Sequence, residues 1–401
     1  MPDALRPGWA SLSLDKLGTV ERGRSRHRPR NASFLYGGKH PFIQTGDVKA
    51  AGLRVNSYSQ NYSDAGLGQS RMWPVGTLCI TIAANICETA ILGLPACFPD
   101  SIVGFTPDPN VSDAVYVKYA LDYQKRRFSG ISQGTTQENL SVEKLLSQRF
   151  PVPPLHEQRR IASILSAYDD LIEVNRRRIA ILEDMARRLF DEWFVHLRFP
   201  GHEAVAVHDT PAGPRPDGWV MGIVGDLLTL HRGYDLSTND RSPGDVPVMT
   251  GSGRNGTHNT HKVAAPGVVT GRSGTIGPVF LVHENFWPLN TALYVSSFTC
   301  VGPTFALFLL RQLDLRTRAG GAAVPTLNRN HVHALPALRP PETMVERYER
   351  LAAPMLQQVW NLAQQSERLA GARDLLLPRL VSGELSVADA PAPDHLLAAA
   401  E

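Results

Sequence analysis

The sequence of 401 residues has little cysteine, no long apolar run and a formal net charge of only +3. Its four cysteines (Cys79, Cys87, Cys97 and Cys300) form no close pair and have no histidine at ligand spacing. We therefore expect buried thiols in a reducing compartment rather than disulfides or zinc. No segment has the length of a membrane span or the pattern of a signal peptide, so we expect an intracellular, cytoplasmic chain without a membrane partner. So small a charge does not by itself indicate nucleic-acid binding.

Motifs for catalysis are also missing. The sequence has no GxxxxGK[ST] phosphate loop, no Asn-Pro-Pro-Tyr-like methyltransferase motif and no acidic nuclease cluster. GSGRNG at 251–256 fits a dinucleotide fingerprint and GISQG at 130–134 fits a nucleophile elbow, but neither has the required neighbouring elements, so we interpret them as a turn and a loop. Two histidine pairs lack further ligands, and we expect surface or phosphate-facing side chains there: His258 with His261, and His331 with His333. These absences predict a non-enzymatic chain with no metal or cofactor.

The longest regular pattern runs through the middle of the chain, from Pro153 to Val195. No Pro or Gly occurs between Leu155 and Phe199, so a helix of about 40 residues is permitted. Asn175 and Arg178 fall in its apolar seam, where polar residues fix register and pairing. The apolar stripe consists of Ile161, Ile164, Leu165, Tyr168, Leu171, Ile172, Ile179, Leu182, Met185 and Leu189.

A second stretch of the same design runs from Pro340 to Val381. It also begins with two prolines and an acidic residue, and its heptad positions are Tyr348, Met355, Leu362, Leu369 and Leu376. Pro354 predicts an early kink and Pro378 an end to this helix. Because each stripe needs a partner, we expect the two helices to pair as an antiparallel coiled coil.

The stretches before the two helices repeat as well. Gly8-Trp9 recurs as Gly218-Trp219 and Arg22-Gly23 recurs as Arg232-Gly233 at the same interval, and PFIQTG at 41–46 is echoed by PVMTG at 247–251. We predict an α+β protein made by tandem duplication, with two similar mixed α/β domains separated by the two long helices. Residues 114–128 read as a helix followed by a polar loop, and 198–217 as a linker. The expected boundaries are 1–150 for the first domain, 151–197 for the central helix, 198–338 for the linker and second domain, 339–384 for the distal helix and 385–401 for a disordered tail.

This organisation resembles the specificity subunit of type I restriction-modification systems. The resemblance is carried by PVPPLHEQRRIASILSAYDDLI at 151–172, by LLLPRLVSGEL at 375–385, by the GTTQENLS approach to the first helix and by the domain–helix–domain–helix order. It covers the chain up to about Ser386. The second copy departs from the pattern, because GTTQENL becomes AAVPTLN and HEQRRI becomes ETMVERY.

The resemblance implies two target-recognition domains that each read one half of a split, asymmetric site in double-stranded DNA. The helices would dock two methyltransferase subunits, and two motor-nuclease subunits would join where a system has them. S-adenosylmethionine would then belong to the methyltransferase partner, and ATP with Mg²⁺ to the motor-nuclease partner. A different hypothesis is a non-catalytic coiled-coil scaffold that binds proteins, which predicts weak and salt-insensitive DNA association.

Three sets of polar residues are candidate DNA contacts. Arginine suits phosphates and guanine, and Gln or Asn suits adenine. A solvated loop, an ordinary turn and a helix N-cap, respectively, are the competing interpretations of the three sets. The first set is Arg22, Arg24, Arg26 and Arg28 with Arg232; the second is Thr45, Asp47, Arg71, Thr250, Ser252, Arg254, Arg272 and Ser273; the third is Thr135, Thr136, Gln137 and Asn139 with Asn328 and Arg329.

Aromatic residues gather at the end of the central helix. Trp193, Phe194 and Phe199 lie there, and Trp360 lies on the distal helix. They are candidate anchors for a methyltransferase subunit, since aromatic residues are common at interfaces. Packing against their own domains is the favoured alternative.

Overall fold

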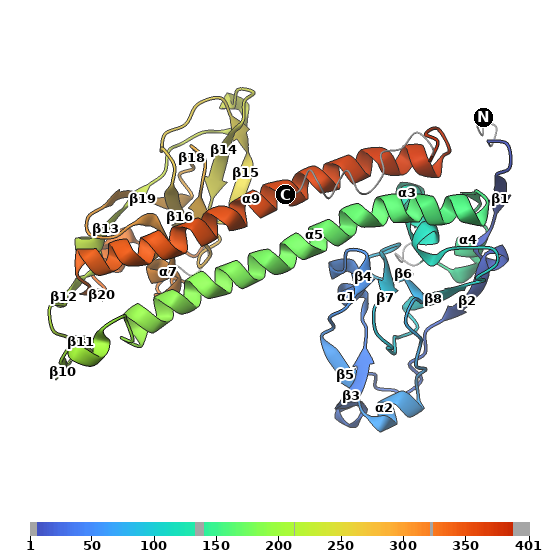
Figure 1. The fold of residues 1–401 in the computed structure, drawn as a ribbon, viewed down its shortest axis with the longest axis horizontal. Coiled ribbons are helices and arrows are strands. Elements are labelled where there is room, and N and C mark those ends of the chain that lie inside the picture. Colours follow the sequence, from blue (N-terminus) through green and yellow to red (C-terminus); the bar gives the residue numbers. More distant parts are fainter. Residues whose placement is uncertain (1–5, 133–139, 212, 321–323, 388–401) are drawn as a thin grey trace. The chain divides into compact units, whose positions relative to one another are not determined.

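The computed structural model describes residues 6–132, 140–211, 213–320 and 324–387 (Figure 1). The chain forms two compact units. Unit 1 consists of Met1–Asn175 and Gln364–Glu401, and unit 2 consists of Arg176–Ala363. Two long helices, α5 (Leu155–Phe190) and α9 (Glu342–Val381), run through both units, so each unit combines a mixed α/β domain with a segment of each helix.

Unit 1 is built on a five-stranded sheet with the order β2-β8-β6-β7-β4, antiparallel except between β4 and β7. The central strands β6 and β7 are mainly apolar and are buried along their whole length. The strands are β2 (Gly18–Arg22), β4 (Arg54–Val55), β6 (Leu78–Thr81), β7 (Thr89–Leu92) and β8 (Ile102–Pro107). Around them lie β1 (Ala10–Leu12) paired with β9 (Phe150–Val152), β3 (Tyr36–Phe42) paired with β5 (Gln60–Tyr62), and the helices α1 (Thr45–Ala50), α2 (Asp64–Gly68), α3 (Ala114–Ser132) and α4 (Val142–Leu146).

Unit 2 repeats this plan with a four-stranded sheet of order β13-β19-β16-β17. Its strands are β13 (Leu228–Arg232), β16 (Gly267–Gly271), β17 (Val279–Val282) and β19 (Ala292–Phe298). A second sheet has the order β15-β14-β18, from β14 (Val246–Thr250), β15 (Gly253–His258) and β18 (Trp287–Pro288). The remaining elements are β12 (Val220–Ile223) paired with β20 (Pro336–Arg339), and the helices α6 (Val224–Leu227), α7 (Pro303–Gln312) and α8 (Arg329–His333).

Strand register confirms the tandem duplication at the outer strands. Ala10 pairs with Val152 in unit 1, and Val220 pairs with Arg339 in unit 2. The interval from Ala10 to Val220 is the one between the two Gly-Trp motifs, and the interval from Val152 to Arg339 is the one between the two proline pairs. Strands that pair in one unit therefore have pairing counterparts in the other.

The central sheets follow the same alignment. Arg22 pairs with Val103 in unit 1, and its repeat Arg232 pairs with Leu293 in unit 2. Val103 and Leu293 are thus equivalent positions, and the turns that precede them correspond as well. Both units share one framework.

The long helices are antiparallel in each unit. In unit 1, the Asn175 amide on α5 donates to Gln365 at 2.8 Å and to Ser366 at 3.3 Å. Asp169, which precedes Asn175 on α5, is paired with Arg373 further along α9. In unit 2, the Tyr348 hydroxyl donates to the carbonyl of Ala186 at 3.3 Å. The predicted antiparallel pairing is confirmed, and Asn175 lies in the seam as expected.

Two positions of the central helix differ from the prediction. Arg178 and Met185 are exposed, and the buried positions move to Ala186 and Phe190, because a helix of 3.6 residues per turn drifts away from a strict seven-residue repeat. The distal helix α9 runs through Pro354 as one element and ends at Val381, close to Pro378, where its end was predicted. Pro354 is exposed, so the carbonyl that loses its partner can bond to water.

Two loop predictions also need correction. The predicted helix 114–128 extends to Ser132, so part of the expected polar loop is helical. The predicted linker 198–217 contains a hairpin of β10 (Val207–Thr210) and β11 (Gly213–Pro216), whose turn includes Gly213 at a φ of +110°. The predicted tail beyond residue 387 lies outside the described residues.

The aromatic cluster after α5 belongs to the core of unit 2. Trp193 and Phe199 are 6% and 3% exposed, and Phe194 packs against the same core. Trp360 is half-buried, with its ring 6.0 Å from that of His283. Packing against their own unit is therefore the correct interpretation of the first three residues, and Trp193 and Phe199 are buried by it. Within the described ranges, no helix is both long and apolar enough to span a membrane.

Candidate nucleic-acid interface

The arginine-rich segment after β2 is held against the turn before β8. The backbone N–H of Gly23 donates to Ile102 at 2.8 Å, and that of Arg24 donates to Phe98 at 3.0 Å. A side chain at Gly23 would lie 2.2 Å from the carbonyl oxygen of Pro99, so only glycine fits there. This close approach fixes where the arginines that follow are placed.

The next residues of this segment are anchored from one side and exposed on the other. Gln69 accepts the backbone N–H groups of Arg26 and His27 at 2.5 and 2.9 Å, and the Ser70 hydroxyl donates to the carbonyl of Arg24 at 2.7 Å. Gly23 and Ser25 are buried, whereas the side chains of Arg24 and Arg26 are exposed and have no polar partner within the described part of the chain. A fixed backbone that presents two free guanidinium groups differs from the solvated loop considered as the alternative.

Asp100 organises the other arginines of this segment. Its backbone carbonyl accepts the Nε–H of Arg22 at 2.6 Å, and its Oδ2 lies 2.8 Å from Nη2 of Arg30 and 3.9 Å from Nη2 of Arg28. We call this group the arginine edge of unit 1: Arg22, Arg24, Arg26, Arg28, Arg30 and Asp100. A cleft of about 480 Å³ is lined by Arg22, Arg30 and Asp100 together with Ser141 at the start of α4.

Unit 2 holds the corresponding segment in the same way. The N–H of Gly233 donates to Ala292 at 3.1 Å, that of Tyr234 donates to Pro288 at 2.8 Å, and a side chain at Gly233 would lie 2.2 Å from the carbonyl oxygen of Leu289. These are the contacts of Gly23 and Arg24, made again at the equivalent positions of the second repeat. The backbone frame of the candidate interface is therefore duplicated.

The side chains on that frame differ between the units. Arg232 donates to Asp235 at 3.1 Å, and the amide of Asn290 also donates to Asp235. Asn290 corresponds to Asp100 in the alignment of the repeats, and its carbonyl accepts the Nε–H of Arg272 at 2.7 Å. A guanidinium thus lies on the same turn carbonyl in both units, although Arg22 supplies it in one and Arg272 in the other. We call Arg232, Asp235, Arg272 and Asn290 the polar edge of unit 2.

Three further predicted contacts lie beside the polar edge of unit 2. Ser273 follows Arg272, and its N–H donates to the carbonyl of Thr291 at 3.1 Å. The N–H of Leu327 donates to the carbonyl of Arg272 at 2.8 Å, which places the start of α8 beside this edge. Asn328 is the N-cap of α8, since its Oδ1 accepts the N–H of Asn330 at 3.0 Å, and Arg329 begins that helix. The capping alternative is correct for Asn328, although the residue is exposed at this edge.

Several other predicted contacts have internal roles. Thr250 is 8% exposed and its hydroxyl is used within the β14–β15 turn, as the turn interpretation expects. Asp47 caps α1 by accepting the N–H of Gln44 at 2.8 Å. Arg71 is paired with Glu21 at 2.5 Å and stacks on Trp73 at 4.1 Å.

The remaining predicted contacts are placed as follows. Arg254 is exposed and lies 3.6 Å from Glu284, Ser252 is exposed in the same β14–β15 turn, and Thr45 begins α1. Neither the arginine edge nor the polar edge includes these three residues. Thr135, Thr136, Gln137 and Asn139 lie outside the described residues.

Two of the histidines considered as surface groups are structural. Nδ1 of the buried His258 accepts the N–H of Ser242 at 3.1 Å, and Nε2 of His333 accepts the N–H of Leu230 at 2.8 Å. Burial, assisted by Arg329, lowers the pKa of His333, which keeps the ring neutral as an acceptor. In the part of the chain that the structure describes, no three His, Cys, Asp or Glu side chains gather as metal ligands.

Three of the four cysteines are buried as predicted, and Cys300 is only partly buried. All four are free, and Cys79, Cys87 and Cys97 are buried. Burial raises the pKa of Cys87 to about 12, and it also raises that of Cys79. These thiols are therefore protonated and unreactive at neutral pH.

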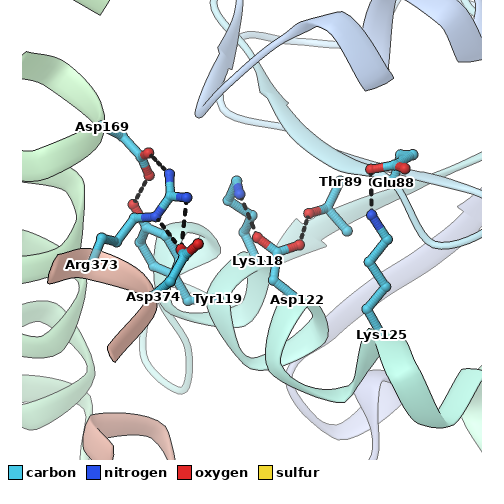
Figure 2. A network of polar contacts seen from close by, with 9 residues as sticks. All are labelled: Glu88, Thr89, Lys118, Tyr119, Asp122, Lys125, Asp169, Arg373 and Asp374. Atoms are coloured by element: carbon cyan, nitrogen blue, oxygen red, sulfur yellow. Dashed lines mark hydrogen bonds and ion pairs between the residues drawn. The ribbon is translucent and has the colours of Figure 1, made fainter. Parts of the chain in front are cut away.

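A polar network fastens the domain of unit 1 to both long helices (Figure 2). Asp169 on α5, whose side chain is 4% exposed, accepts the hydroxyl of Tyr119 on α3 at 2.5 Å and is paired with Arg373 on α9. Burial, followed by the charge of Asp169, raises the pKa of Tyr119, so the hydroxyl remains a donor. Further ion pairs extend the network along α3, from Lys118 to Asp122 and from Lys125 to Glu88.

Comparisons with known proteins agree with this geometry. The family described as "Type I restriction modification DNA specificity domain" matches residues 7–184. The MjaIX specificity subunit of a type I restriction enzyme from Methanocaldococcus jannaschii is 25% identical over 407 residues, covering 94% of each chain. A putative type I specificity subunit of Mycoplasma pneumoniae is 33% identical over 91 residues, 21% of this chain and 24% of that protein.

A solved structure shares the fold. The type I restriction-modification S subunit from M. genitalium matches with a TM-score of 0.66 at 15% identity, covering 94% of this chain and 97% of that one. It agrees with the chain order found here, in which each of two mixed α/β domains is followed by a long helix. Residues 7–184 thus match the family of type I restriction-modification DNA specificity domains, and over nearly its whole length the chain is similar to a type I specificity subunit.

Proposed function

We propose that this chain reads a bipartite, asymmetric DNA sequence, one half with each globular domain, and performs no chemistry itself. The observation that carries this proposal is a duplicated backbone frame with different polar side chains. Gly23 and Gly233 hold equivalent segments in place, but a run of arginines follows Gly23 in unit 1, whereas unit 2 has Arg232, Asp235 and Arg272 at its edge. Equivalent frames suit equivalent docking on DNA, and different side chains read different bases.

The free and the tethered arginines have different tasks in this proposal. Arg24 and Arg26 are exposed without a partner among the described residues, so they suit phosphate contacts, which need charge but little orientation. Arg22 and Arg30 in unit 1 and Arg272 in unit 2 are oriented by hydrogen bonds or ion pairs, which suits a bidentate approach to a guanine edge.

The partners follow from the same proposal. The long helices dock two methyltransferase subunits, and each subunit flips its target base, an adenine by analogy with the family, out of the duplex. S-adenosylmethionine is held by the methyltransferase subunits, and ATP with Mg²⁺ by motor-nuclease subunits where these are present. The chain itself contributes sequence selection and the spacing of its partners.

The test is to map DNA methylation by single-molecule sequencing. Cells with this chain and its neighbouring methyltransferase subunit are compared with cells in which the gene for this chain is deleted. A split, asymmetric methylated motif that disappears on deletion supports the proposal. An unchanged methylation pattern, with expression and complex formation confirmed, contradicts it and favours a protein-binding scaffold.

Salt dependence separates the DNA reader from the scaffold. Several phosphate contacts should make the affinity of the purified complex for its motif fall steeply between about 50 and 200 mM salt, by at least tenfold. A scaffold predicts weak association that changes little over this range.

A further inference from the structure

We propose that Asp100 in unit 1 and Asp235 in unit 2 are positioning residues, each of which orients the arginines that read its own half of the DNA target. This inference rests on the proposed function, because it assigns the orientation of guanidinium groups that the proposed function uses. It concerns two carboxylates that neither the sequence patterns nor the arginine spacing indicated.

The contacts of Asp100 distinguish it from a residue that merely stabilises its turn. Among the described residues its carboxylate accepts no backbone N–H, and Oδ1 is buried without a hydrogen-bond partner. Oδ2 contacts only Arg30 and Arg28, at 2.8 and 3.9 Å. The carboxylate therefore orders guanidinium groups and not the loop that carries it.

Asp235 occupies a different position in the repeat but has the same kind of neighbours. Its two carboxylate oxygens lie 3.1 and 3.2 Å from Nη2 of Arg232, and Oδ1 also accepts the amide of Asn290, the counterpart of Asp100. The carboxylate has thus moved from the turn before the strand to the segment after the glycine. Each unit nevertheless keeps one carboxylate beside its arginines.

A carboxylate at such an edge has two consequences for DNA recognition. It restricts the guanidinium groups before binding, so less entropy is lost when one of them approaches a base bidentately. Its negative charge also offsets the positive charge of one arginine, which weakens the attraction of this edge to the phosphates of any DNA sequence. Both effects increase the difference between the affinities for right and wrong DNA, and that difference is specificity.

The experiment uses the full chain in complex with its methyltransferase subunits. Binding is measured to a duplex with the intact methylated motif, to one with only the first half changed, to one with only the second half changed and to one without the motif. Exchange of residues 198–338 shows which half belongs to unit 2. In wild type, changing either half should weaken binding.

Asp100→Asn should reduce the penalty for changing the unit 1 half by about tenfold, which is in the lower part of the range for one bidentate base contact. It should leave the penalty for the unit 2 half unchanged and increase affinity for the duplex without the motif. Asp235→Asn should reduce the penalty for changing the unit 2 half and leave the penalty for the unit 1 half unchanged. A purely structural role would instead weaken binding to all duplexes by the same factor.

Two variants keep the test decisive. Arg30→Gln removes the cation from the same ion pair, so it should lower discrimination in the unit 1 half even if Asp100→Asn does not fold. Asp15→Asn removes an equal charge from an exposed carboxylate beside Lys16 and should alter neither half. Unchanged discrimination in Asp100→Asn and Arg30→Gln, with a discriminating wild type, overturns this inference alone. A wild-type complex that binds all four duplexes equally overturns the proposed function and this inference with it.

Discussion

At the scale of single residues, Gly23 shows how one position determines the shape of the candidate interface. A Cβ there would approach the Pro99 carbonyl oxygen to 2.2 Å, and that oxygen belongs to backbone that cannot rotate away. Gly23→Ala should therefore lower the free energy of unfolding by about 1–3 kcal/mol, as overpacking of a tight site does. Urea unfolding of the full chain measures this. Gly46→Ala, which meets no atom within 4 Å, is the matched control and should change stability little; equal effects of the two variants would contradict the steric explanation.

Glu349 provides a residue-scale prediction about pH. Burial raises the pKa of Glu349 above its ordinary value of 4.5, although the carboxylate accepts the N–H of Phe305 at 2.8 Å. A carboxyl whose pKa is raised in the folded state binds its proton more tightly there, so its contribution is fully present below pH 4.5 and is lost as pH rises through the raised pKa. As the pH falls from 7 to 4.5, the free energy of unfolding of wild type should therefore increase relative to that of Glu349→Gln. Unfolding midpoints of both proteins across this range test it, and a constant difference would contradict it.

At the scale of elements, three helices of unit 1 meet at Asp169. Arg373→Met would leave this carboxylate, 4% exposed, without its cation, and should cost about 2–4 kcal/mol of unfolding free energy. Replacing both partners, with Asp169→Leu and Arg373→Met together, should recover part of the loss, because no buried charge then remains. A double-mutant cycle by urea unfolding measures the coupling. Arg188→Met, at an exposed ion pair on α5, should cost less than about 1 kcal/mol, and a similar cost for Arg373→Met would show that the Asp169 pair is not special.

The long helices were predictable because their signal is local. Apolar spacing indicated both helices, and Asn175 was correctly placed in the seam, since position along a helix determines which face a residue occupies. The heptad extrapolation was wrong at Arg178 and Met185 because small deviations from 3.5 residues per turn accumulate. Pro354 does not end α9, since exposure on one face allows a helix to continue past proline.

The candidate interface was only partly predictable. Constant intervals between recurring motifs identified the duplication, and the same intervals recur in the strand register. Arg22 and Arg28 were found from composition, but Asp100 was not, because it lies at least 70 residues from its arginine partners and only the folded sheet brings them together. Thr250 and Asp47, which were predicted as DNA contacts, serve a turn and a helix cap, and the sequence does not separate these roles because turn and capping residues have the same composition as a binding loop.

At the scale of the whole molecule, the central claim is that each globular domain independently specifies one half of the DNA target. The most direct measurement is to exchange residues 198–338 for the same segment of another specificity subunit whose target is known, and to map methylated motifs by single-molecule sequencing. If the claim holds, one half of the motif changes to that of the donor while the other half stays the same. A change in both halves, or in neither half of a complex that still methylates DNA, would contradict it.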